Sequence, residues 1–181
     1  EREEIRRKRE EGLPPPWTQN RILANYRFCN VRRADDRVSK WIHSNIILKH
    51  PDSLLLASLG RWVNRPETLE ILLQWDWTFP VPFDIYAHKA MELPKPFFNP
   101  AYVIPNCGLK MDKIELVMTI ALPPVEELKF DSRKSLKETT LKLRQLYGWG
   151  NFMAYQTALD HCHDASDAYD WAIAGPGTRK G

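Results

Sequence analysis

Two helical patterns near the C-terminal end of the sequence are joined by Leu146-Tyr147-Gly148-Trp149-Gly150-Asn151-Phe152-Met153-Ala154-Tyr155. One apolar face precedes the turn at Leu136, Leu143 and Leu146, and another follows it at Phe152, Tyr155, Leu159 and Cys162. Glycines at 148 and 150 permit a sharp turn and the close approach of another backbone. The amides that open the second helix form a natural seat for phosphate. The pattern predicts a helical hairpin whose turn can bind a phosphate; the alternative is a plain connection between two helices without a ligand.

The turn resembles the helix-hairpin-helix of DNA glycosylases, with a hydrophobic-x-Gly-x-Gly pattern and the small Ala154 four residues after Gly150. In that superfamily the hairpin grips the DNA backbone and a catalytic Asp commonly follows; here Asp170 lies 20 residues after Gly150. Glycosylases that also cleave the backbone place a Lys where this chain has Phe152. No Schiff-base chemistry is therefore expected at that position.

Composition is that of a globular protein. The 181 residues are 43% hydrophobic and 27% charged, with a net charge of +3, and they include 20 aromatic residues. This excludes disorder as the default state, and no apolar run is long enough for a membrane helix. Three cysteines without a C-x-x-C pair predict a reducing, intracellular setting. Strand-type alternation is nearly absent, so the predicted fold is mainly α, a helix-hairpin-helix DNA glycosylase-like helical domain.

The expected organisation is one helical DNA-acting domain over residues 1–181, with a charged N-terminal helix and a proline-rich linker in residues 1–16. Helices are predicted over 1–11, from an N-cap at Thr18 to Arg27, over 31–50, from Asp52 or Ser53 to Trp62, from Pro66 to Trp75, and over 83–91, 111–122 and 132–147. Residues 94–105 are predicted to form a loop with a strand turn near Tyr102-Val103. The lack of an initiator Met predicts trimmed ends.

Four motifs occur in order along the chain: Tyr26-Arg27-Phe28-Cys29-Asn30-Val31-Arg32-Arg33-Ala34-Asp35-Asp36-Arg37-Val38-Ser39, Phe98-Asn99-Pro100-Ala101-Tyr102, Phe152-Met153-Ala154-Tyr155-Gln156 and Ala174-Gly175-Pro176-Gly177-Thr178-Arg179-Lys180-Gly181. Together they resemble the alpha-glutamyl/putrescinyl thymine pyrophosphorylase family, which includes the helical domain of hydroxymethyluracil DNA kinases. Members occur mostly in phages that hypermodify thymine. The resemblance covers nearly the whole chain.

The resemblance implies an enzyme that transfers an amino acid or polyamine onto pyrophosphorylated hydroxymethyluracil in DNA, with release of pyrophosphate. The implied partners are modified DNA, the free amine donor and a hydroxymethyluracil DNA kinase; no cofactor, metal or membrane is expected. The implied location is the cytoplasm of an infected host cell, or the nucleus for a eukaryotic source. Members continue beyond the Gly-Pro-Gly segment, whereas this chain stops there, which leaves open whether part of the site is missing.

The chemistry calls for cations on the leaving group and a carboxylate base for the amine. The predicted diphosphate-binding residues are Arg27, Arg33, Arg37, Arg179 and Lys180, with Arg33 and Arg37 spaced to share a helix face. The general base is predicted to be Asp170, with Asp36 and Asp160 as reserves that could instead hold an Arg in place. The predicted DNA contacts are Gly148, Trp149, Gly150, Asn151, Gly175 and Gly177. The predicted base pocket is Asn30, Tyr155 and Gln156, although Tyr155 also lies on the apolar helix face, where core packing is the commoner role.

Two other functions remain open. A monofunctional glycosylase would excise a modified base, and a non-catalytic helical module would present DNA to a kinase. The absence of a G-x-x-x-x-G-K-[ST] phosphate loop counts against this chain being the kinase itself. His161-Cys162-His163-Asp164 is not interpreted as a metal site, because adjacent helical positions point in different directions.

Overall fold

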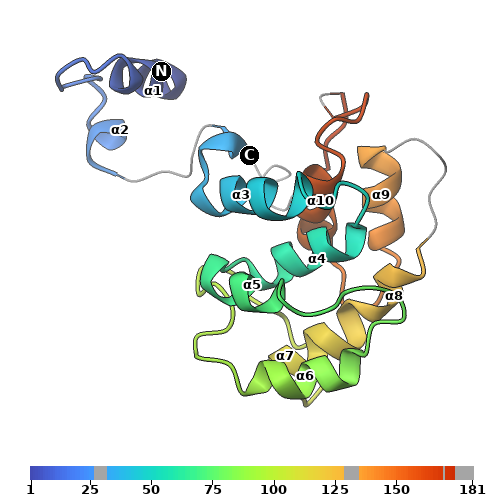
Figure 1. The fold of residues 1–181 in the computed structure, drawn as a ribbon. Helices are drawn as coiled ribbons and strands as arrows, with labels where there is room; N and C mark the ends of the chain where they lie inside the picture. Colours follow the sequence, from blue (N-terminus) through green and yellow to red (C-terminus); the bar gives the residue numbers. More distant parts are fainter. Residues whose placement is uncertain (27–31, 129–134, 169, 174–181) are drawn as a thin grey trace. The chain divides into compact units, whose positions relative to one another are not determined.

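The computed structural model describes residues 1–26, 32–128, 135–168 and 170–173, and these are helical with no strand among them (Figure 1). The predicted mainly α fold is confirmed. The strand turn expected near Tyr102-Val103 was wrong: residues 99–102 form a turn closed by the Tyr102 N–H donating to the Asn99 carbonyl at 3.0 Å. The chain forms two compact units, Glu1–Lys40 and Trp41–Gly181.

Helix α1 (Arg2–Glu10) in the first unit is a solvated helix, as its charge pattern predicted. Arg6 pairs with Glu3 at 2.7 Å and with Glu10, and Lys8 pairs with Glu4 at 2.9 Å. The guanidinium groups of Arg6 and Arg32 lower the pKa of Glu3 to about 2. No residue of α1 is buried, so exposed ion pairs of this kind contribute little to stability.

Two helices in this part of the chain begin at other residues than predicted, because other side chains cap them. Helix α2 (Arg21–Asn25) is capped by Asn20, whose side chain accepts from two backbone N–H groups; the expected cap, Thr18, instead accepts from the Asn20 N–H at 3.0 Å. The helix expected over 31–50 is broken at Asp36, whose carboxylate accepts from the Ser39 N–H at 2.7 Å. A short polar side chain that bonds the backbone in this way starts a helix rather than continuing one. The result is a 3-10 turn η1 (Arg33–Asp35), then α3 (Arg37–Ile42) and a π-helical turn η2 (His43–Ile47).

Helix α4 (Leu54–Val63) is the central helix of the second unit, and all its residues are buried. Of the two predicted caps, Asp52 and Ser53, it is Ser53 that starts the helix, because the Ser53 hydroxyl accepts from the Leu56 N–H at 3.1 Å. Gly60 allows η2 to approach closely, since a Cβ there would lie 2.9 Å from Cδ1 of Ile46. α4 therefore contacts helices on several sides and organises the core.

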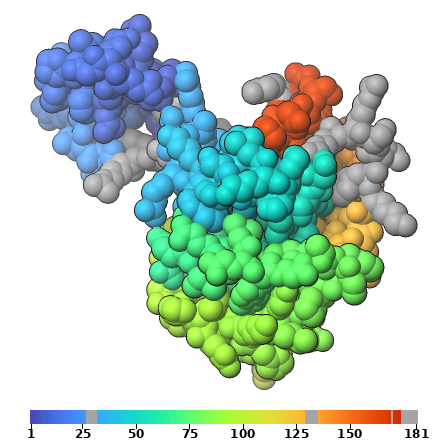
Figure 2. All heavy atoms as spheres, in the orientation of Figure 1, coloured from blue at the N-terminus to red at the C-terminus, as the bar shows by residue number. Residues whose placement is uncertain are grey.

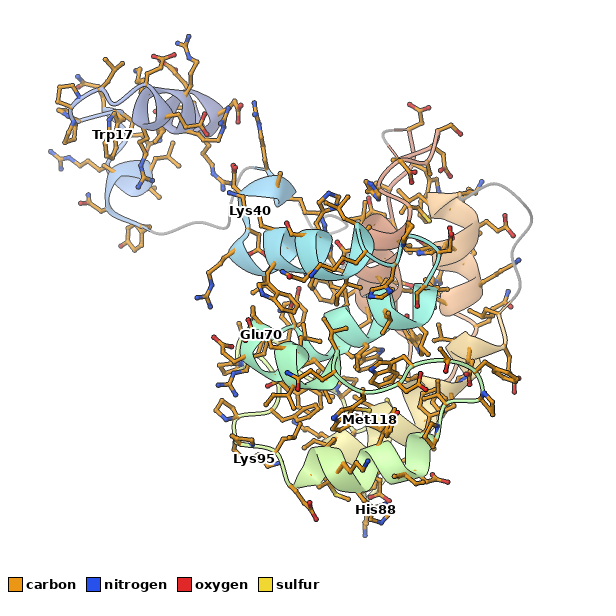
Figure 3. The ribbon with its side chains drawn as sticks, in the orientation of Figure 1. Trp17, Lys40, Glu70, His88, Lys95 and Met118 are labelled. Atoms are coloured by element: carbon orange, nitrogen blue, oxygen red, sulfur yellow. The ribbon has the colours of Figure 1, made fainter. Side chains whose placement is uncertain are left out.

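Further helices complete one side of this core: α5 (Pro66–Leu72), α6 (Phe83–Met91), α7 (Lys113–Leu116) with the π-helical turn η3 (Val117–Ala121), and α8 (Pro123–Glu126). The bounds of α6 match the prediction, whereas α8 was not predicted. Met118 of η3 is fully buried near α6, while His88 points outward (Figure 3). In the space-filling view the green atoms of α5, α6 and their loops form the lower part of the visible face of this unit, below the teal atoms of the residues that precede α5 (Figure 2). No described helix is long and apolar enough to span a membrane.

The expected hairpin is formed by α9 (Leu136–Leu143) and α10 (Asn151–His161), which pack side by side (Figure 1). Helix α10 also packs on α4, so the hairpin belongs to the core of the second unit. The start of α9 is held from a distant part of the chain, because the Asp167 carboxylate accepts from the N–H groups of Leu136 at 2.8 Å and Lys137 at 3.0 Å. These bonds lower the pKa of Asp167 against the opposing effect of desolvation.

Candidate functional site

The two glycines of the hairpin turn have different roles. Gly148 has φ +84°, and a Cβ there would lie 3.3 Å from Sγ of Cys107. Gly150 has an ordinary backbone conformation (φ −78°, ψ 169°), and a Cβ there would meet nothing within 4 Å. The fold therefore requires glycine at 148, and no contact within the described residues requires it at 150.

The first turn of α10 is an open edge of the molecule. Gly150 is its N-cap residue and supplies no side-chain hydrogen bond, although Ser, Thr, Asp or Asn would cap the helix. Gly150 is exposed and Phe152 is 57% exposed. We call Gly150, Asn151 and Phe152 the α10 edge. Open amides at a helix start attract anions, so this edge can accept a phosphate oxygen.

Trp149, predicted to contact DNA, is instead buried. Its indole N–H donates to the Ala121 carbonyl at 2.8 Å, and its ring meets the ring of Trp62 edge-on at 5.5 Å. This correction has a plain cause: burial of a large aromatic side chain between the glycines anchors the turn to η3 and α4. Trp149 thus positions the α10 edge.

A loop from the middle of the chain flanks the turn. The Asn99 side-chain amide donates to the Asn64 carbonyl at 3.0 Å, which attaches the loop to the end of α4. Further along the loop, the Tyr102 ring meets the Phe152 ring edge-on at 5.5 Å. The Tyr147 hydroxyl donates to the carbonyl of Cys107. The second and third sequence motifs therefore meet at the α10 edge, which their separation in the sequence did not reveal.

A buried ion pair joins the two helices behind this edge. Arg61 of α4 donates from Nε and Nη2 to the carboxylate of Asp160 on α10, the second bond at 3.0 Å, and from Nη1 to Oδ1 of Asn64 at 3.2 Å. Desolvation acts to lower the pKa of Arg61, but the Asp160 carboxylate and the Tyr102 hydroxyl outweigh it and raise the pKa. Asp160 therefore holds an Arg in place, the alternative role considered for it. Sequence reasoning did not find Arg61, although a lone Arg within an otherwise apolar helix was a usable signal.

The chain after α10 turns back along that helix. Asp170 is exposed, its N–H donates to the Asp167 carbonyl at 3.2 Å, and the next residue, Trp171, meets the Tyr155 ring at 5.9 Å. Tyr155 is half-buried against the small core of Leu136, Ala158, Cys162 and Ala165, so it packs as its helix face suggested. Gln156 is half-buried on the same helix.

The predicted cations of the first unit do not share a helix face. Arg33 lies in η1 and Arg37 begins α3, and the extended backbone of Asp36 separates them. That expectation was wrong because Asp36 caps α3 instead of continuing a helix. Six predicted residues lie outside the described part of the chain: Arg27, Asn30, Gly175, Gly177, Arg179 and Lys180. Within the described ranges no group of three or more His, Cys, Asp or Glu side chains is placed to hold a metal ion.

These features define a helical domain whose hairpin is bonded to the core at one end of α10 and open at the other. The chain belongs to the family described as "5-hmdU DNA kinase, helical domain", which matches residues 1–181. A relative, the 5-hmdU DNA kinase of Bacillus phage SP10, is 28% identical over 207 aligned positions, covering 94% of this chain and 32% of that protein. The chain thus spans about a third of the length of this curated relative. No solved structure matches it.

Proposed function

We propose that this chain binds DNA carrying hydroxymethyluracil and acts in thymine hypermodification, with the α10 edge as the contact to the DNA backbone. The observation that carries the proposal is Gly150: no contact among the described residues requires glycine there, whereas a backbone approaching the open amides of α10 would need one. Membership of a family named for a DNA kinase supports a DNA phosphate as the anion.

The charge around the turn supports this partner. Residues 139–159 include Lys142 and Arg144 but no acidic residue, although the chain has 23 Asp and Glu in all. Arg144 is exposed at the C-terminal end of α9. A stretch with cations and no carboxylates suits a polyanion, because each phosphate contact releases a counterion from the DNA.

The test is binding of the chain to matched duplexes that differ only in thymine or hydroxymethyluracil at one position, across a series of salt concentrations. The expected result is binding that weakens steadily with salt and is tighter for the modified duplex. Absence of binding to either duplex at low salt contradicts the proposal.

The proposed reaction is transfer of an amine onto pyrophosphorylated hydroxymethyluracil. The amine nitrogen forms a bond to the methylene carbon, the carbon–oxygen bond to pyrophosphate breaks, and the proton lost by the amine passes to Asp170. Its exposure leaves the carboxylate accessible to an incoming amine. Asp36 is the reserve base, and Arg27, Arg33, Arg37, Arg179 and Lys180 are the proposed cations for the leaving group.

Mass spectrometry of nucleosides tests the reaction. Pyrophosphorylated hydroxymethyluracil DNA is incubated with the chain and mixed amines, and the expected product gains the mass of one amine as pyrophosphate is released. Asp170→Asn and Arg37→Ala should each lower the rate at least tenfold. Full activity in either variant removes the role assigned to that residue, and release of free base instead identifies excision.

A second candidate is a non-catalytic module that presents DNA to a kinase domain. The match to the helical domain of a kinase about three times as long favours it. Salt-dependent DNA binding without any new nucleoside, together with stimulation of a 5-hmdU kinase domain supplied separately, would support this module over the transferase.

A further inference from the structure

Phe152 is an exposed aromatic residue on a helix whose other large side chains are buried or half-buried. The apolar pattern placed Phe152 on the same face as Tyr155 and Leu159, which pack against the small core, yet 57% of Phe152 remains exposed. It lies two residues after the open Gly150. Sites that bind single-stranded nucleic acid combine an exposed aromatic ring with a contact to phosphate. Phe152 and the proposed phosphate contact at Gly150 form such a combination.

The ring of Phe152 is in contact with the ring of Tyr102. The two rings meet in a T-shaped arrangement with their centroids 5.5 Å apart, so Tyr102 covers at most one face of the Phe152 ring. The loop that carries Tyr102 is fixed because the Asn99 N–H donates to the Val63 carbonyl at 3.1 Å and the Asn99 side chain donates to the Asn64 carbonyl at 3.0 Å. Support of this kind limits the conformational entropy that a ligand must remove on binding.

Charge identifies the occupant as nucleic acid rather than an apolar protein surface. The two segments that meet here, residues 93–111 and 139–159, contain no Asp or Glu and include Lys95, Lys110, Lys142 and Arg144. Lys142 is paired with Glu138 at 2.7 Å. Aromatic rings combined with the cations Lys95, Lys110 and Arg144 match a nucleobase attached to a phosphate. An acidic partner without an aromatic or flat apolar group would not use the rings, and a purely apolar partner would not use the cations.

We propose that Phe152, supported by Tyr102, stacks on a nucleobase displaced from the duplex beside the phosphate held at Gly150. The inference rests on the proposed DNA binding and adds the base contact to it. Chemistry on a base requires that the base leave the stack, and a ring at the backbone contact lowers the free-energy cost of that displacement. Stacking depends on the π-face of a base and not on its identity. Phe152 therefore helps to displace a base from the duplex, and other residues select which base is displaced.

The test uses a hydroxymethyluracil duplex with 2-aminopurine beside the modified base, because unstacking of 2-aminopurine raises its fluorescence. The wild-type chain should raise the signal on binding. Phe152→Ala should abolish the rise and weaken binding about tenfold, whereas Phe152→Trp should keep both. Tyr102→Ala should give an intermediate loss.

Phe79→Ala is the matched control, since Phe79 is 78% exposed in a loop outside the two segments. It should behave as wild type, and circular dichroism should show the same helix content for every variant. An unchanged fluorescence rise in Phe152→Ala overturns the inference. Salt-dependent binding by wild type without any rise overturns it while leaving the proposed function standing, and no binding at all overturns both.

Discussion

The two ends of α10 are governed by different constraints. At the C-terminal end, Asp160 is buried and bonded to Arg61, and its neighbours Ala158 and Cys162 are fully enclosed. At the N-terminal end, Gly150 has open space around it and Phe152 is largely exposed. Packing and hydrogen bonding within the fold explain the residues found at the C-terminal end of α10. They do not explain the residues at its N-terminal end.

This contrast separates residues retained for stability from residues available for function. A buried ion pair confers little net stability over an apolar pair, but it cannot lose one partner without leaving an unpaired charge. The α10 edge can lose side chains with little effect on the fold. Variants at the two ends should therefore change different measurements.

The largest expected effect is at the buried end. Asp160→Ala leaves the Arg61 guanidinium buried without its carboxylate, and the free energy of unfolding should fall by about 3–5 kcal/mol. Urea denaturation followed by circular dichroism measures the loss. The double variant Arg61→Met/Asp160→Leu should recover most of it, because no unpaired charge remains. A loss below about 1 kcal/mol for Asp160→Ala would show that water or another group stabilises Arg61.

The next effect concerns the capping of α9 by Asp167. Asp167→Asn should cost about 1–2 kcal/mol, because a weaker acceptor replaces a carboxylate that receives two backbone N–H groups and the Ser135 hydroxyl. The folded pKa of Asp167 is lowered. Its contribution is therefore complete above the unfolded value of about 3.9 and is lost as the pH falls through the lower, folded value.

Denaturation midpoints from pH 7 down to pH 2 check this sign. The difference between wild type and Asp167→Asn should be constant at the upper end and shrink below about pH 4. Asp164→Asn, an exposed carboxylate nearby, should show no comparable difference at pH 7. A difference that grows as the pH falls contradicts the assignment.

A loss of stability of similar size is expected from the first glycine of the turn. Gly148→Ala forces a Cβ into left-handed backbone and brings it to 3.3 Å from Cys107 Sγ, so the cost should be about 1–2 kcal/mol. Gly150→Ala should cost less, about 0.5–1 kcal/mol, because its backbone is ordinary and its surroundings among the described residues are open, and the loss comes only from Ala being a poor N-cap. Equal losses from the two substitutions would remove the distinction between the glycines.

Local signals predicted much of this fold because local physics decides it. Ser53 before an apolar run starts α4, the period of residues 83–91 gives α6, and two glycines between periodic segments give the α9–α10 hairpin. The errors in the predicted helix boundaries have the same local origin. Asp36 caps α3 at a position where the apolar pattern predicted a continuous helix, and Asn20 caps α2 where Thr18 was the predicted cap. Choosing between such caps depends on small differences in hydrogen-bond energy.

The site was less predictable because it joins distant parts of the chain. Arg61 and Asp160 are 99 positions apart, and no spacing rule links them. Trp149, placed between two glycines, gave no indication that η3 would accept its indole N–H. Glycine at 150 was correctly read as part of the turn, but only the structure shows that nothing inside the described chain requires it.

The smallest effect on stability is expected for Gly150→Ser, which should nevertheless weaken the binding of DNA clearly. Gly150→Ser adds a hydroxyl at the N-cap that can accept from the amides of the first turn of α10, so stability should change by only a few tenths of a kcal/mol. The same hydroxyl occupies the amides proposed for phosphate and adds bulk at the point of approach. Loss of about one charge-assisted hydrogen bond should weaken DNA binding about tenfold.

Gly148→Ala should show the reverse pattern at temperatures where it remains folded, with reduced stability and near-normal affinity for DNA. If Gly150→Ser binds DNA as tightly as wild type, the phosphate does not lie at this end of α10, and the openness of Gly150 has another cause.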